Sequence, residues 1–114
     1  MRRAMIDWRR VEELREEIGA DGFSEVADMF LDEAEQAVRA LQSGLAAGDI
    51  AAQLHFLKGS ALNLGLSDLA AICQEGERKA ATGEGGAIDI GQVAAVYRDS
   101  RSQLVRRLAT DSAA

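Results

Sequence analysis

The sequence predicts an all-α fold, an antiparallel up-down four-helix bundle with an additional short N-terminal helix. Proline, which interrupts helices, is absent from all 114 residues, and alanine, leucine, glutamate and arginine dominate. Apolar residues recur at intervals of three and four, the period of helices with one buried face. A chain of this length forms one core, so we expect residues 1–114 to be a single domain.

The first expected helix follows Asp7, a suitable N-cap. Ile6 and Val11 are spaced as a hydrophobic staple around that cap, and Gly19 favours the end of the helix. The second helix is expected over about residues 22–46. Its apolar residues form one stripe: Phe23, Val26, Phe30, Ala34, Ala37, Val38, Leu41 and Leu45.

A tight turn is predicted before the third helix, because Gly48 can end one helix and Asp49 can cap the next. The third helix is expected over residues 49–64, with an apolar stripe made of Ile50, Leu54, Leu57, Ala61 and Leu64. We interpret Gly65 as the residue that ends it, which is a structural role.

The fourth helix is expected over residues 67–81, with Ser67 as its cap and Cys73 as a small buried side chain. The next residues, TGEGGA at 82–87, have the composition of a flexible linker. The last helix is expected over residues 89–110.

Asp89 and Gln92 are spaced as a capping box at the start of that last helix, with Ile88 and Val93 as the staple. Its expected core residues are Val93, Val96, Tyr97, Leu104 and Leu108. Short connections of this kind make consecutive helices antiparallel neighbours.

Composition excludes several classes of protein. The net charge of −6 disfavours nucleic acid as a partner. The single cysteine excludes an internal disulfide and a multi-cysteine metal site. No apolar run approaches the roughly 20 residues that span a bilayer, and the N-terminal residues lack the apolar segment of a signal peptide. We therefore expect a cytoplasmic monomer with no bound metal.

The only histidine, His55, lies off the apolar stripe of the third helix. At about 100° per residue, it points about 140° away from the centre of that stripe and so faces solvent. Small, cationic and aliphatic residues share its side of the helix: Ala51, Ala52, Lys58, Gly59 and Leu62.

This arrangement suits transfer of an anionic group. A neutral imidazole can act as a nucleophile, and Lys58, one turn away, can hold the charge of an incoming phosphoryl group. Gly59 lacks the side chain that would obstruct a macromolecule approaching His55, although a glycine inside a helix costs about 1 kcal/mol relative to alanine. The sequence has no phosphate-binding loop, so a partner must deliver the group.

The segment HFLKGSALNLGL, from His55 to Leu66, resembles the signature of histidine-containing phosphotransfer (HPt) domains of multistep phosphorelays. The resemblance rests on H-x-x-K-G, on a second glycine six residues further on, and on the leucine-rich LSDLAAIC that follows. It implies a four-helix bundle in which His55 is the phosphoacceptor and Lys58 the cation that supports the phosphoryl group. Gly59 would be the residue whose missing side chain leaves space for a partner. It also implies a docking surface that includes Ala51, Ala52 and Leu62.

Two positions depart from the pattern of the family. Leu62 stands where many relatives carry glycine or alanine. Glu77 stands where some relatives carry a glutamine that reaches the histidine. A carboxylate there can orient the ring, but its charge opposes a phosphoryl group, so its role stays open.

The resemblance implies a phosphocarrier that takes a phosphoryl group from a receiver-domain aspartate and passes it to another. Its partners would be receiver domains of response regulators or of a hybrid sensor histidine kinase. The sequence offers no ATP site, so we expect no kinase activity, and the Mg²⁺ needed for transfer would come from the receiver.

Other interpretations compete with this one. His55 and Lys58 can be ordinary solvated residues of a helical adaptor that binds partners without phosphoryl chemistry. A sensor-kinase dimerisation domain typically has an acidic residue after its histidine and a nearby proline, whereas Phe56 follows here. A small DNA-binding protein is disfavoured by the negative charge. Whether Trp8 and Phe56 belong to the core or to a docking surface is left open.

Overall fold

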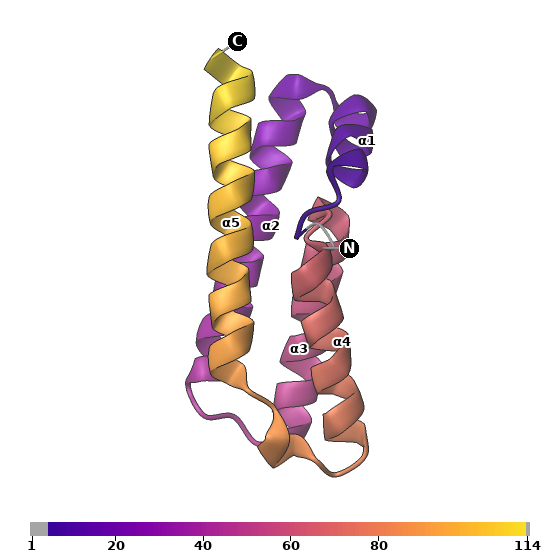
Figure 1. Ribbon diagram of the computed structural model, residues 1–114, viewed down its shortest axis with the longest axis vertical. Coiled ribbons are helices and arrows are strands. Elements are labelled where there is room, and N and C mark those ends of the chain that lie inside the picture. The colour runs from indigo at the N-terminus through magenta and orange to yellow at the C-terminus, as the bar shows by residue number, and fades with distance from the viewer. Residues whose placement is uncertain (1–4, 114) are drawn as a thin grey trace.

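The computed structural model describes residues 5–113 and confirms the all-α class, because this part of the chain contains no strand (Figure 1). Within these residues, the long helices α2, α3, α4 and α5 lie roughly along the longest axis of the molecule, and the shorter α1 lies beside them (Figure 1). Their bounds are α1 Trp8–Ile18, α2 Ala20–Gln42, α3 Ala47–Leu64, α4 Ser67–Ala81, the 3₁₀ helix η1 Gly85–Ala87, and α5 Ile90–Ala113.

Helix α1 begins and ends as predicted. The Asp7 carboxylate accepts hydrogen bonds from the backbone N–H groups of Arg9 and Arg10, and Ile6 and Val11 are buried as the staple requires. Gly19 ends the helix at a φ of +85°. Because this one glycine redirects the chain, α2 begins at the next residue, two residues before the expected start.

The prediction for the turn between α2 and α3 is wrong. Helix α2 ends at Gln42 instead of residue 46, and the chain turns at Gly44, whose φ is +86°. Helix α3 has therefore already begun when the chain reaches Gly48 and Asp49, which lie in its first turn instead of acting as stop and cap. The acidic Asp49 still suits the positive end of the helix dipole there.

Gly65 ends α3 as predicted, in the left-handed conformation at a φ of +75°. The backbone N–H of Leu66 donates to the carbonyl of Ala61 over 2.8 Å, a bond typical of glycine-ended helices. Ser67 does not cap α4, because Leu66 occupies the cap position and the Ser67 hydroxyl donates back to the Gly65 carbonyl.

Helices α3 and α4 lie side by side (Figure 1) and meet closely at Gly76. A Cβ atom added to this buried glycine would stand 2.7 Å from Cδ1 of Leu54, which is itself completely buried. The absence of a side chain at Gly76 permits this approach, which brings the exposed residues of α3 within reach of α4.

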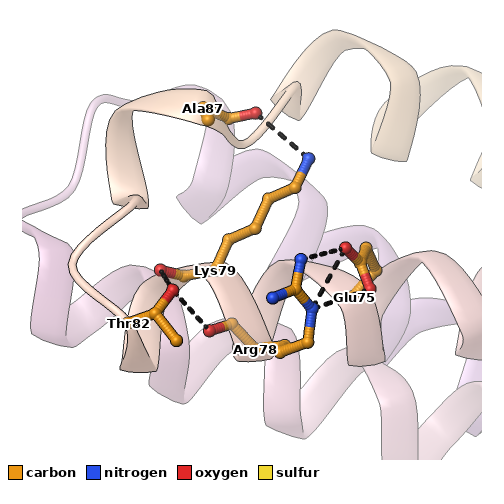
Figure 2. A network of polar contacts seen from close by, with 5 residues as sticks. All are labelled: Glu75, Arg78, Lys79, Thr82 and Ala87. Carbon is orange, nitrogen blue, oxygen red and sulfur yellow. Dashed lines mark hydrogen bonds and ion pairs between the residues drawn. The ribbon is translucent and has the colours of Figure 1, made fainter.

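The connection after α4, where composition predicts a flexible linker, contains the 3₁₀ helix η1 and several hydrogen bonds to the end of α4. The Thr82 hydroxyl donates to the carbonyl of Arg78 over 3.2 Å, and the Lys79 ammonium donates to the carbonyl of Ala87 over 3.5 Å (Figure 2). The Glu84 N–H also donates to the Lys79 carbonyl over 2.7 Å. The residues between α4 and η1 are thus tied to the end of α4.

A buried side chain of helix α5 makes polar contacts with α2. The Tyr97 hydroxyl lies 3.2 Å from the Leu31 carbonyl and 2.8 Å from Oε1 of Glu35, and both oxygens belong to α2. At the start of α5, the Asp89 carboxylate accepts from the N–H of Gln92 as expected of a cap. None of the helices within residues 5–113 is long and apolar enough to cross a bilayer.

Candidate functional site

His55 lies in the middle of α3 on its solvent side. Its side chain is 74% exposed, whereas its neighbour Leu54 and the nearby Leu57 are completely buried. The orientation inferred from the spacing of apolar residues is therefore the one that the structure has. The ring projects from a helix whose opposite face is packed in the core, which is a good support for a group that must meet a partner in a defined geometry.

Glu77, from α4, contacts both of the polar side chains that the sequence singled out on α3. Its Oε1 lies 2.8 Å from Nδ1 of His55, and its Oε2 lies 2.7 Å from Nζ of Lys58. Glu77 is mostly buried, with 22% of its side chain exposed. The three residues form a connected group that crosses the α3–α4 interface, which we call the His55 cluster.

The charge of Glu77 follows from its surroundings. Partial burial by itself would raise the pKa of the Glu77 carboxyl, but the hydrogen bonds from Lys58 and His55 outweigh it and hold that pKa below its usual value. Glu77 is thus ionised at neutral pH and can only accept hydrogen bonds. The proton between Glu77 and His55 therefore belongs to Nδ1, which leaves the lone pair of the neutral ring on Nε2.

Lys58 is more enclosed than its place on the helix surface implies. Only 21% of its side chain is exposed, and its ammonium group pairs with Glu77. This pairing could not be seen in the sequence of α3 alone, because it depends on how α4 is placed beside α3. The sequence expectation for Glu77 concerned its contact with the His55 ring and did not include Lys58.

The surface around His55 is open. A Cβ added to Gly59 would have nothing within 4 Å, Ala52 is exposed, and Leu62 is 57% exposed. Ala51 is half-buried. Phe56, which the sequence left undecided, is about half exposed and so extends this apolar surface.

Trp8, the other residue that the sequence left undecided, is half-buried and packs against the core, so it is not part of this surface. The guanidinium group of Arg107 lies over its ring, 4.9 Å from the centroid. Cys73 is buried as expected, and burial together with the nearby Glu77 charge raises the pKa of its thiol to about 12. No group of three metal-binding side chains occurs within the described residues.

The fold and the exposed histidine define a class of phosphotransfer proteins, and the comparison with family models assigns the chain to it. A model of the Hpt domain matches residues 25–110, so the chain belongs to the Hpt domain family. Hpt domains are phosphocarriers and not kinases, and they work with receiver domains of two-component systems. This protein is accordingly a phosphorelay intermediate.

A solved structure supports the fold. The chain is similar to a rice protein described as a candidate histidine-containing phosphotransfer protein, with a TM-score of 0.73 and 18% sequence identity. The similarity covers 94% of this chain and 79% of the rice chain. A search of curated proteins finds no match.

Proposed function

We propose that His55 is the phosphoacceptor of a relay in which this domain takes a phosphoryl group from one receiver aspartate and passes it to another. The observation that carries the proposal is the His55 cluster, in which the only histidine is exposed and a carboxylate fixes its tautomer. An ordinary solvated histidine has no need of a mostly buried partner on a neighbouring helix.

The proposed reaction is an in-line displacement at phosphorus. The lone pair on Nε2 of His55 forms the P–N bond while the P–O bond to the receiver aspartate breaks, and the aspartate leaves as a carboxylate. The second transfer is the reverse of the first. Lys58 lies one turn from the ring and would support the charge of the phosphoryl oxygens. The Mg²⁺ for this chemistry would be supplied by the receiver.

The partner docks, in this proposal, on the open surface around Gly59. Ala51, Ala52 and Leu62 form that surface, and Phe56 extends it with an aromatic side chain of the kind enriched at protein interfaces. A receiver must bring its aspartate to Nε2, so a residue without a side chain one turn from His55 favours close approach.

Several finer expectations belong to the same proposal. The packing of α3 against both α2 and α4 supports an antiparallel up-down bundle with α1 over one end. Residues 1–114 would act as a single monomeric domain without kinase activity. They would work in the cytoplasm with receivers of response regulators or of a hybrid sensor kinase, and without nucleic acid or membrane.

The test is incubation with a panel of receivers carrying labelled aspartyl phosphate. Wild-type protein should gain label only from a phosphorylated receiver, in an acid-labile and alkali-stable bond, and His55→Gln should gain none. Gly59→Gln should fold normally, because nothing lies near the added side chain, yet accept label at least several-fold more slowly. Label obtained from ATP alone, or label retained by His55→Gln, would contradict the proposal.

A helical adaptor without phosphoryl chemistry is the second candidate, and the apolar surface formed by Phe56 and Leu62 is the observation that favours it. The two candidates differ in how they respond to the loss of the imidazole. An adaptor would bind its partner equally well as wild type and as His55→Gln, and neither form would become labelled.

A further inference from the structure

A small cavity of about 200 Å³ lies between α1 and the end of α3. Its walls include Asp7, Arg10 and Glu13 on the side of α1, and Ala61, Leu62 and Gly65 on the side of α3. Sites for small molecules usually enclose about 300–1,000 Å³, so this cavity is small for a metabolite and suits a single side chain. We call it the α1–α3 notch.

The α1 side of the notch presents a carboxylate that is not neutralised by a partner. The Arg10 guanidinium is already engaged, because its Nε donates to the Asn63 carbonyl over 3.3 Å and its Nη1 lies 3.8 Å from Oε1 of Glu17. The Asp7 carboxylate accepts from two N–H groups at the start of α1. Glu13 is exposed, and its side chain has no hydrogen bond or ion pair within the described part of the chain.

The α3 side of the notch is apolar. Leu62 is 57% exposed, so a large part of its side chain is available for contact with a partner. A glycine or alanine at this position would leave that side of the notch open. Lysine and arginine pack their apolar stems along such a surface while their charged ends reach an anion. The two walls therefore fit a long cationic side chain, with its stem on Leu62 and its charge at Glu13.

We propose that the α1–α3 notch receives a lysine or arginine side chain of the receiver domain and so selects among receivers by charge. The proposal rests on the proposed function of His55. Leu62 belongs to the docking surface and lies seven residues from His55, which is about 10 Å along the helix. An interface of about 800 Å² per partner is wide enough to cover both. A receiver whose aspartate meets the ring can therefore place a cation in the notch in the same encounter.

The notch has a role in recognition and not in the chemical step. Glu13 is on a different helix from His55, and the contacts of the His55 cluster do not include it. An exposed charge at the rim of an interface acts mainly on the rate of association and on its dependence on salt. Changes at Glu13 should therefore alter how well a receiver binds and leave the maximal rate of transfer unchanged.

The variants that test this idea are Glu13→Gln and Glu13→Lys, which should both fold because Glu13 is exposed. The donor is the phosphorylated receiver that labels wild-type protein fastest. Transfer is measured at increasing receiver concentration, in low and in high salt, so that the half-maximal concentration is separated from the maximal rate. The matched control is Glu84→Lys, which changes the net charge equally at the opposite end of the molecule, after α4 (Figure 1).

For Glu13→Lys we expect the half-maximal concentration to rise about tenfold, and for Glu13→Gln about two- to fivefold, with unchanged maximal rates. Both increases should shrink in high salt, which screens exposed charges. Glu84→Lys should stay within about twofold of wild type. The proposal is overturned if Glu13→Lys behaves like Glu84→Lys, or if Glu13→Lys binds the receiver more tightly than wild type does.

A charge-reversal series identifies the cation. The surface lysines and arginines of that receiver are changed to glutamate one at a time, and each form is tested with wild type and with Glu13→Lys. One of them should bind wild type poorly and regain most of the lost affinity with Glu13→Lys. If none does, the notch takes no cation from the receiver. If wild type accepts no label from any receiver, the proposed function fails as well. Normal labelling with no effect at Glu13 removes this inference alone.

Discussion

The surroundings of Lys58 in the structure differ from those that the sequence predicts. Its position on the helix surface predicts a free cation waiting for a phosphoryl group. In the structure its ammonium is already paired with Glu77, 2.7 Å away. In the proposed relay, an arriving phosphoryl group would compete with the Glu77 carboxylate for Lys58, so the lysine also has a structural role.

Lys58→Ala should slow transfer to His55 several-fold, because the variant lacks the charge that supports the phosphoryl oxygens. It should also lower the free energy of unfolding by about 0.5–1 kcal/mol, since it breaks a partly buried ion pair. Transfer kinetics and urea denaturation measure the two effects. Lys79→Ala, at the far end of α4, is the control and should leave transfer unchanged. Normal kinetics in Lys58→Ala would reduce Lys58 to a structural residue.

The sequence was enough to predict the part of the candidate site that lies on α3, but not the part that lies on α4. The periodicity of α3 is enough to place His55, Lys58 and Gly59 outside the core, because a helix fixes the direction of each side chain relative to its neighbours. The part played by Glu77 is different. It depends on the distance and register between α3 and α4, which are set by packing at residues such as Gly76 and Leu54 and carry no signal in the sequence of either helix.

At the scale of elements, the reliable predictions were those in which one residue type decides the outcome. Asp7 caps α1, and Gly19 and Gly65 end helices at positive φ, as their chemistry requires. The turn before α3 was misplaced because Gly44 and Gly48 are both plausible breakers. In the structure Gly44 adopts the positive φ of the turn, while Gly48 lies within the first turn of α3.

Two glycines on the paired helices should respond oppositely to the same substitution. Gly59→Ala should raise the free energy of unfolding by up to about 1 kcal/mol, because the new methyl group meets nothing and the unfolded chain loses freedom. Gly76→Ala should lower it by about 1–3 kcal/mol, because its Cβ would overlap the buried Leu54 side chain. Chemical denaturation of the two variants decides this. Two shifts of the same sign would mean that the α3–α4 contact is not as close as described.

At the scale of the whole molecule, the long helix α5 packs against both α4 and α2. The Tyr97 hydroxyl of α5 fixes the position of this helix against α2 through its hydrogen bonds to the Leu31 carbonyl and the Glu35 carboxylate. Burial, reinforced by the hydrogen bond and the charge of Glu35, raises the pKa of Tyr97 well above its ordinary value.

This shift makes the stability of the protein sensitive to alkali. The native state holds the Tyr97 proton more tightly than the unfolded chain does, so its contribution is complete below the unfolded pKa of about 10 and is lost as pH rises above it. Tyr97→Phe should cost about 1 kcal/mol at neutral pH. Above about pH 10 its free energy of unfolding should fall less steeply with pH than that of wild type. Parallel curves for the two proteins would show that Tyr97 ionises freely in the folded state.

Helix α1 lies outside residues 25–110, the part matched by the family model, yet it holds the turn on which the His55 cluster depends. The Asp7 N–H donates to the Gly65 carbonyl over 2.7 Å, and Arg10 donates to the Asn63 carbonyl over 3.3 Å. A slip of one residue between α3 and α4 would move their side chains by about 1.5 Å, more than a hydrogen bond tolerates. The N-terminal helix thus braces the turn between α3 and α4. From one end of the molecule it helps to hold the two helices in the alignment that brings the ring, the carboxylate and the ammonium together near the middle.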